Sequence, residues 1–193
     1  MSDSLPNTGL PVEEAIAELR DALASRRHSV LIAPPGAGKT TLVPLRLFHE
    51  NWVAGRKIVM LEPRRLAARA AAQRMAHMLG EKVGDTVGYQ TRDERKIGAN
   101  TRIEVLTEGI LTRRLQNDPT LEGTALVIFD EVHERNVPTD LGLAFLLDAI
   151  KTFSTDVKIL AMSATAQTQL FAHVLADDKG DAPIITSEGR KFP

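Results

Sequence analysis

The stretch that decides the fold reads Ser29-Val30-Leu31-Ile32-Ala33-Pro34-Pro35-Gly36-Ala37-Gly38-Lys39-Thr40. Its first five residues are a short, mostly apolar run that ends at two prolines, which predicts a buried strand. A helical pattern follows from Thr40 to Asn51. A glycine-rich turn between a strand and a helix is the context that a phosphate-binding loop requires. The stretch therefore predicts a P-loop nucleotide site.

Each residue type in this loop suits phosphate chemistry. Gly36 and Gly38 permit backbone conformations that a Cβ would obstruct, so successive amide N–H groups can face phosphate oxygens. The Lys39 ammonium can reach the terminal phosphates, and the Thr40 hydroxyl can ligate Mg²⁺ at the positive end of the helix dipole. Ala33 stands where the broad pattern has its first glycine, and its methyl is small enough for a strand end. The expected phosphate contacts are Gly36, Ala37, Gly38, Lys39, Thr40 and Thr41. A glycine-rich turn without function is the alternative.

A second motif places two carboxylates at the end of another apolar run. The run Ala125-Leu126-Val127-Ile128-Phe129 leads into Asp130-Glu131-Val132-His133. Adjacent buried carboxylates without a partner would be unfavourable, and a bound cation removes that penalty. We expect Asp130 to hold Mg²⁺ and Glu131 to act as the base for the water that attacks the γ-phosphate. A surface turn or helix cap is the bland alternative, which the phosphate loop disfavours.

The rest of the pattern alternates strands and helices. Further strands are expected at 57–61, 86–90, 102–106, 125–129 and 158–162, and helices at 12–27, 40–51, 66–79, 109–116, 139–151 and 167–175. This alternation predicts an α/β fold of three layers, with a mainly parallel sheet covered on both faces. Ligands of such sheets bind at the carboxyl ends of the strands, where both motifs lie.

Composition limits the other function classes. With 43% hydrophobic and 25% charged residues in 193, the chain is typical of one ordinary globular domain. It has no cysteine, which excludes disulfides and thiolate metal sites, and the four histidines other than His133 lack metal-ligand spacing. We interpret these four as surface or partly buried residues. No secretory signal or membrane span is expected, and a cytoplasmic location is the prediction.

The ordered motifs resemble the DEAH-type helicases of superfamily 2. Beyond the phosphate loop and the acidic box, the resemblance rests on four segments: Pro63-Arg64-Arg65, Gly88-Tyr89-Gln90-Thr91-Arg92, Thr107-Glu108-Gly109-Ile110-Leu111 and Ser163-Ala164-Thr165. The closing Glu188-Gly189-Arg190-Lys191-Phe192-Pro193 is similar to the start of a second lobe. Leu10-Pro11-Val12 and the sequence DEVHER resemble the bacterial HrpB-type helicases within this family.

The resemblance implies a first RecA-like lobe that uses ATP and Mg²⁺. It implies that His133, Ser163 and Thr165 link the γ-phosphate state to movement between lobes, and that Arg74 stacks on the adenine. For Arg74, a solvated helix charge is the alternative. The implied division is an N-terminal segment and helix at 1–28, a RecA-like ATP-binding domain at 29–187 and the start of a linker at 188–193.

The charge distribution is uneven along the chain, which can mark a face that meets phosphates, and a solvated helix surface is the equally favoured alternative from the counts alone. Residues 56–114 hold 13 basic and 7 acidic side chains, whereas residues 115–193 hold 6 and 12. Within the basic block, the expected nucleic-acid contacts are Arg64, Arg65, Arg92, Thr107 and Gly109. These groups suit phosphates rather than base edges, and the scarcity of aromatic residues argues against extensive base stacking. RNA and DNA both remain open, with RNA favoured.

The sequence therefore predicts the ATP-binding lobe of an ATP-dependent helicase. The expected partners are single-stranded nucleic acid and a second RecA-like lobe, with no membrane partner. Two alternatives belong to other classes. A P-loop kinase or small-molecule nucleotidase would turn over ATP without responding to nucleic acid, and a regulatory module would bind nucleotide without hydrolysing it. The intact Glu131 disfavours the regulatory module.

Overall fold

The computed structural model describes residues 6–166 and 168–189. The helices are α1 (Glu13–Ser25), α2 (Lys39–Leu47), α3 (Arg65–Met78), α4 (Glu108–Asn117), α5 (Val137–Phe153) and α6 (Gln169–Val174), with a short 3-10 helix η1 (Val132–Glu134). The strands are β1 (His28–Ile32), β2 (Lys57–Leu61), β3 (Val87–Gln90), β4 (Arg95–Lys96), β5 (Ile103–Leu106), β6 (Thr124–Phe129), β7 (Lys158–Ser163) and β8 (Ile184–Thr186).

The eight strands of the described residues form one sheet. Their order is β4-β3-β5-β2-β6-β7-β1-β8. Every neighbouring pair is parallel except β3 and β4, which pair antiparallel through Tyr89 opposite Lys96 and Gln90 opposite Arg95. The central strands are buried along nearly their whole length and are rich in Val, Ile and Leu, as expected where helices cover both faces of a parallel sheet.

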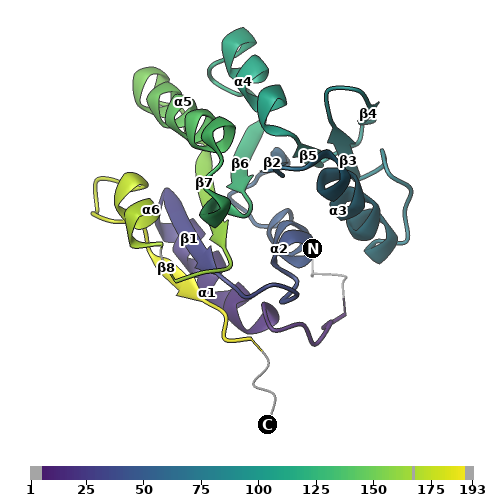
Figure 1. Ribbon diagram of the computed structural model, residues 1–193, viewed down its shortest axis with the longest axis horizontal. Coiled ribbons are helices and arrows are strands. Elements are labelled where there is room, and N and C mark those ends of the chain that lie inside the picture. The colour runs from purple at the N-terminus through teal and green to yellow at the C-terminus, as the bar shows by residue number, and fades with distance from the viewer. Residues whose placement is uncertain (1–5, 167, 190–193) are drawn as a thin grey trace.

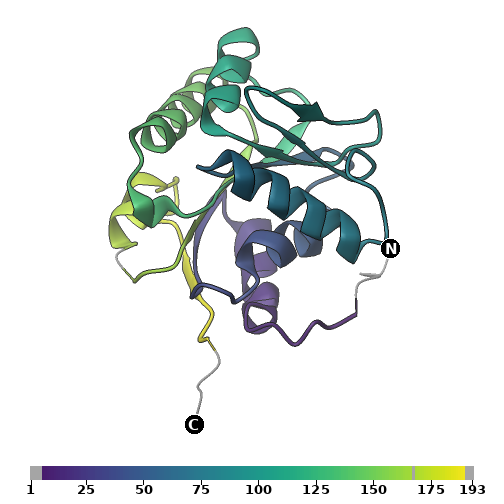
Figure 2. The same ribbon diagram turned by 45° about the vertical axis from the view of Figure 1, so that its right-hand side comes forward.

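Two hydrophobic clusters separate the sheet from its two helix layers. One cluster joins α1, α2 and α3 to the side chains on one face, including Ile58, Met60 and Ile128. The other joins α4, α5 and α6 to the alternate side chains, including Val59, Val127 and Phe129. Figure 1 shows α4, α5 and α6 together on one side of the sheet, and Figure 2 shows α1, α2 and α3 on the other. The predicted three-layer α/β fold is confirmed.

The predicted elements are present, with boundaries that shift by a few residues. The largest difference is α2, which ends at Leu47, because residues 48–55 form turns that close at Gly55 with a φ of +80°. α5 begins at Val137 and has Pro138 in its first turn, where backbone N–H groups have no acceptor within the helix, so the N–H that proline lacks is not needed. The expected start of the last helix at Gln167 lies outside the described residues. Two edge strands, β4 and β8, were not predicted.

Candidate nucleotide site and nucleic-acid face

The phosphate loop connects β1 to α2 and turns at two glycines. Gly36 and Gly38 have φ angles of +76° and +91°, a backbone region that residues with a Cβ rarely adopt. A Cβ on Gly38 would also lie 2.6 Å from Leu10 Cδ1. Since α2 begins at Lys39, directly after the loop, its free N-terminal amides and its dipole face the loop. The loop is therefore shaped to bind an anion.

Lys39 is buried and lies against the acidic box. Its side chain is 4% exposed, and Nζ lies 2.7 Å from Glu131 Oε1. A buried ammonium needs a negative partner. In this structure Glu131 is that partner, and a triphosphate bound at the loop would supply another. The structure thus brings the predicted cation of the loop together with the predicted base.

Thr40 and Asp130 meet at the carboxyl end of β6. The Thr40 hydroxyl donates to Asp130 Oδ2 at 2.5 Å, and the backbone N–H of Glu131 donates to Asp130 Oδ1 at 2.8 Å. Asp130 is only 2% exposed. A hydroxyl and a carboxylate oxygen are the donors that Mg²⁺ prefers, and Mg²⁺ is usually completed by water and substrate phosphates. The pair fits that ion, although the described residues contain no group of three or more His, Cys, Asp or Glu side chains arranged to hold a metal ion.

A third carboxyl, Glu62, belongs to this corner and was missed by the sequence analysis. It follows β2, which neighbours β6, and is 4% exposed. Burial, followed by the negative charge of Asp130, raises the pKa of Glu62 to about 9. Burial also raises the pKa of Asp130. Burial and the mutual repulsion of the two carboxyls outweigh the Lys39 charge at Glu62, so Glu62 retains its proton at neutral pH. The signal that could have found Glu62 is its place at a strand end beside Pro63.

Glu131 and His133 lie side by side in the turn after β6. Glu131 has a φ of +53°, an uncommon conformation for a residue with a side chain. Its Oε2 lies 3.2 Å from His133 Nδ1, and the backbone N–H of Ala164 donates to the same nitrogen at 3.2 Å. His133 Nδ1 therefore lies between the Glu131 carboxylate and the Ala164 amide. The imidazole connects the acidic box to the segment after β7.

Ser163 and Thr165 form a small turn at the end of β7. Ser163 Oγ donates to the Thr165 carbonyl at 3.1 Å and accepts from the Thr165 backbone N–H at 3.1 Å. Ser163 is 1% exposed. The described contacts of both hydroxyls are therefore local, and their connection to the acidic box runs through Ala164 and His133.

Arg74 lies on α3 at the wall of a cavity beside the phosphate loop. This cavity of about 470 Å³ is lined by residues of the loop, the acidic box and α3, among them Thr40, Thr41, Glu62, Arg64, Arg74, Glu131 and Glu134. The Arg74 side chain is exposed. The stacking of Arg74 on the adenine stays a prediction.

The expected nucleic-acid residues lie after three neighbouring strands. Arg64 and Arg65 follow β2, Thr107 follows β5 and Arg92 follows β3, and these strands are adjacent in the sheet. Arg64 pairs with Glu134 at 3.0 Å, and Arg65 pairs with Asp93. Both guanidinium groups are exposed, so nucleic-acid phosphates could replace their acidic partners at little cost in free energy. Gly109 is exposed in the first turn of α4.

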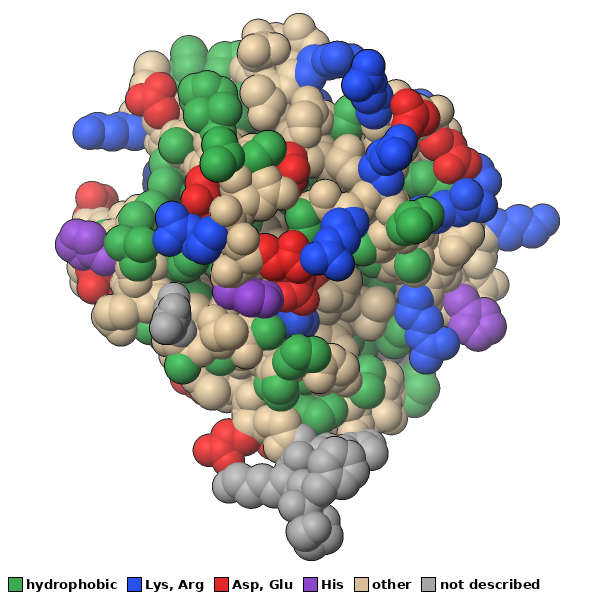
Figure 3. Space-filling view, in the orientation of Figure 1, with side chains coloured by type: hydrophobic (Ala, Val, Ile, Leu, Met, Phe, Trp, Pro, Cys, Tyr) green, Lys and Arg blue, Asp and Glu red, His purple; other side chains and the backbone are tan. Residues whose placement is uncertain are grey.

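Basic side chains gather on this part of the surface. Figure 3 shows Lys and Arg side chains gathered over the region of α3, β3 and β4 with some acidic side chains among them, and further acidic side chains near the centre of the same face. The excess of basic side chains favours a polyanion on that side, and the acidic centre favours a cation. No helix among the described residues has the length and apolar character to cross a membrane.

Fold and site together define a P-loop nucleotide-binding domain with a RecA-like sheet. Residues 13–172 match the family of DEAD/DEAH box helicases, so the chain belongs to that family. It is 50% identical over 186 residues to the ATP-dependent RNA helicase HrpB of Escherichia coli strain K12, covering 96% of this chain and 22% of that protein. It is 37% identical to the ATP-dependent RNA helicase DHX30 of Gallus gallus, covering 95% of this chain and 15% of that protein.

Solved structures give the same assignment. The crystal structure of Escherichia coli DEAH/RHA helicase HrpB matches with a TM-score of 0.88 and 49% identity, over 96% of this chain and 23% of that chain. A crystal structure of E. coli DExH-box NTPase HrpB matches with a TM-score of 0.86 and 47% identity, over 98% and 23%. The chain therefore spans about a fifth of the length of these relatives.

Proposed function

We propose that this chain is the first motor lobe of an ATP-dependent RNA helicase, with residues 29–187 as its RecA-like ATP-binding domain. The observation that carries the proposal is the meeting of Lys39, Thr40, Asp130 and Glu131 at one edge of the sheet. The four side chains come from two motifs 90 residues apart, and their chemistry suits a triphosphate with Mg²⁺.

Each residue of this corner has a proposed role. The loop amides of residues 36–41 and Lys39 bind the phosphates, and Thr40 and Asp130 hold Mg²⁺. When bound, Mg²⁺ would neutralise charge on the phosphate oxygens. Glu131 accepts a proton from the attacking water once the triphosphate has replaced it as the partner of Lys39. His133 positions this turn against Ala164, and Ser163 and Thr165 report the state of the site to a second lobe.

Nucleic acid is proposed to bind along the adjacent strand ends. Arg64, Arg65 and Arg92 would contact phosphates, and Thr107 and Gly109 would supply a hydroxyl and an exposed backbone. The relatives named as RNA helicases support RNA over DNA. We further propose that Arg74 covers the adenine, that the lobe acts together with a second RecA-like lobe, and that it works in the cytoplasm.

ATP turnover with and without single-stranded RNA or DNA tests the proposal. The protein should be a polypeptide in which this lobe is followed by a second lobe. Stimulation by RNA that disappears in Glu131→Gln is the expected result. Turnover that ignores nucleic acid would instead identify a small-molecule nucleotidase, and binding without any turnover would identify a regulatory module.

A further inference from the structure

The segment of residues 6–12, here called the N-terminal strap, lies directly on the phosphate loop. The backbone N–H of Val12 donates to the Ala37 carbonyl at 3.1 Å. The Leu10 side chain covers Gly38 so closely that a Cβ on that glycine would approach Leu10 Cδ1 to 2.6 Å. Val12 itself is fully buried. None of the roles proposed above uses these contacts.

At its other end, the strap is held by α2, the helix that follows the phosphate loop. Arg46, in the last turn of α2, is 5% exposed and donates to the Pro6 carbonyl at 2.9 Å and to Glu13 Oε1 at 2.6 Å. The Thr8 backbone N–H donates to the same carboxylate oxygen at 3.1 Å. The strap therefore runs along α2 from its last turn back to the loop.

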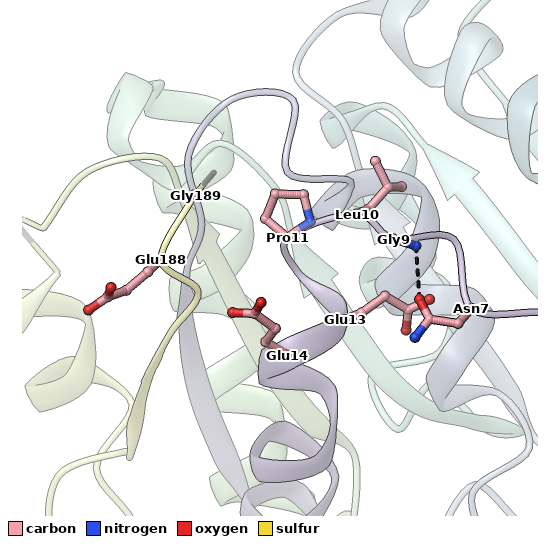
Figure 4. Close-up of a pocket in the computed structure, with 8 residues that line it drawn as sticks. All are labelled: Asn7, Gly9, Leu10, Pro11, Glu13, Glu14, Glu188 and Gly189. Carbon is pink, nitrogen blue, oxygen red and sulfur yellow. Dashed lines mark hydrogen bonds between the residues drawn. The ribbon is translucent and has the colours of Figure 1, made fainter. Parts of the chain in front are cut away.

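Within the strap, local bonds fix the backbone. The Gly9 N–H donates to Asn7 Oδ1 at 2.8 Å, and Figure 4 shows this bond together with Leu10 and Pro11 beside the segment that carries Gly189. Gly189 also approaches the loop, since a Cβ there would lie 2.7 Å from Pro34 Cγ. Segments far apart in the sequence therefore both contact the loop.

The bond from Val12 determines which way one loop amide points. The Ala37–Gly38 peptide is trans, so its carbonyl and its N–H point in opposite directions. Because the Ala37 carbonyl accepts from the Val12 amide, the Gly38 N–H points away from Val12. No group within residues 6–166 and 168–189 accepts a hydrogen bond from this N–H. It is therefore available to a phosphate oxygen.

We propose that the N-terminal strap positions the phosphate loop, with the Val12 amide and the Leu10 side chain holding the Gly38 N–H toward the nucleotide phosphates. This inference rests on the proposed function of the loop as a phosphate site. The strap touches the outer side of the loop, so Leu10 and Val12 are positioning residues and do not contact the nucleotide. Without them, the 37–38 peptide can rotate and the loop loses one aligned donor.

Val12→Pro removes the donor, and the φ of −64° at Val12 is one that proline adopts. The matched control is Val12→Ala, which retains the N–H and loses buried side-chain contacts. Both variants are compared by titrating the 193-residue chain with a labelled Mg-ADP and a labelled Mg-ATP analogue. Urea unfolding without ligand establishes that each variant is folded under the binding conditions.

We expect Val12→Pro to bind both nucleotides about tenfold more weakly, because a hydrogen bond to a charged phosphate is lost. Val12→Ala should stay within about twofold of the unaltered chain despite its lower stability, since a loss of packing does not turn the peptide. Equal affinity of Val12→Pro and Val12→Ala would overturn the proposal. If the unaltered chain bound neither nucleotide, the proposed phosphate site itself would fail.

Leu10 gives an independent test that leaves the backbone donor in place. Leu10→Ala uncovers Gly38 and should weaken both nucleotides by about threefold, whereas Leu10→Met refills the space and should restore affinity. An affinity unchanged in Leu10→Ala would remove the side chain from the proposal. A loss that Leu10→Met failed to restore would do the same.

Discussion

Replacing Glu62 by glutamine should change how the stability of the nucleotide-free protein depends on pH. In the folded chain this carboxyl is buried beside Asp130, and its pKa is raised from 4.5 to about 9. In the unfolded chain it loses its proton near its ordinary value. Between these values the folded state holds a proton that the unfolded state has released. The free energy of unfolding therefore falls as the pH rises.

The magnitude follows from this proton difference. One proton contributes about 1.4 kcal/mol per pH unit, so the interval from pH 7 to 8.5 should cost about 2 kcal/mol of unfolding free energy. The amide introduced by Glu62→Gln would remain uncharged at every pH and could still donate to Asp130. We therefore expect Glu62→Gln to remove most of this slope. Between pH 7 and 8.5, the unfolding free energy of Glu62→Gln should rise by about 2 kcal/mol relative to that of the unaltered chain.

Urea unfolding in EDTA at several pH values between 7 and 8.5 measures both slopes. His28 is present in both proteins, so its titration cancels in the difference between the two slopes. Parallel slopes in the two proteins would show that Glu62 is ionised in the folded state and would refute the proton-sharing pair.

The remaining predictions concern the site and one buried histidine. Lys39→Ala should abolish binding of a labelled ATP analogue, since it removes the cation of the phosphate loop, whereas Glu131→Gln should bind it normally and stop turnover in a two-lobed protein; normal binding by a folded Lys39→Ala would disprove the site. Ser163→Ala with Thr165→Ala should reduce duplex unwinding more than ATP hydrolysis in the two-lobed protein, and equal losses would argue against coupling. Burial lowers the pKa of His28 to about 4, so the free energy of unfolding should fall by about 1.4 kcal/mol per unit as the pH drops from 6.5 toward 4, and His28→Asn should lack this slope in acid urea unfolding. The 193-residue chain alone should leave a duplex intact in a strand-displacement assay, and unwinding by the short chain would contradict this. The resemblance to DEAH-type helicases implies that the arginine fingers, which stabilise charge on the γ-phosphate and are typically worth about 10³ to 10⁵ in rate, come from the second lobe.

The sequence predicted those parts of the fold that follow from periodicity and from glycine chemistry. Buried central strands have continuous apolar runs, and β2 has the bounds 57–61 that its run predicted. The edge strands β4 and β8 carry no such signal: β4 is two exposed basic residues, Arg95 and Lys96, and β8 has only three residues. Pairing with a neighbouring strand, rather than their own side chains, makes them part of the sheet.

Burial of single polar residues was harder to predict than the motifs. His28 was expected at or near the surface, but it is 3% exposed, and its Nδ1 accepts the Ile159 backbone N–H at 3.1 Å. Glu62 was not expected at the site at all. In both cases the burial results from strands that are distant in sequence and adjacent in the sheet, β7 beside β1 and β6 beside β2. The order of strands is tertiary information that local patterns do not contain.

The turn from Glu131 to Asn136 connects the nucleotide site to the proposed nucleic-acid face. Glu134 pairs with Arg64 at 3.0 Å, and Asn136 donates to the buried carboxylate of Glu108 at 3.0 Å, next to the expected nucleic-acid contacts Thr107 and Gly109. At its start, Glu131 pairs with Lys39. The short helix η1 lies between Glu131 and Arg135, which both have positive φ, so the two ion pairs belong to one short turn. A phosphate that takes Arg64 from Glu134 would thus act on the segment that carries the proposed catalytic base, and a triphosphate that takes Lys39 from Glu131 would act on the contacts of Arg64.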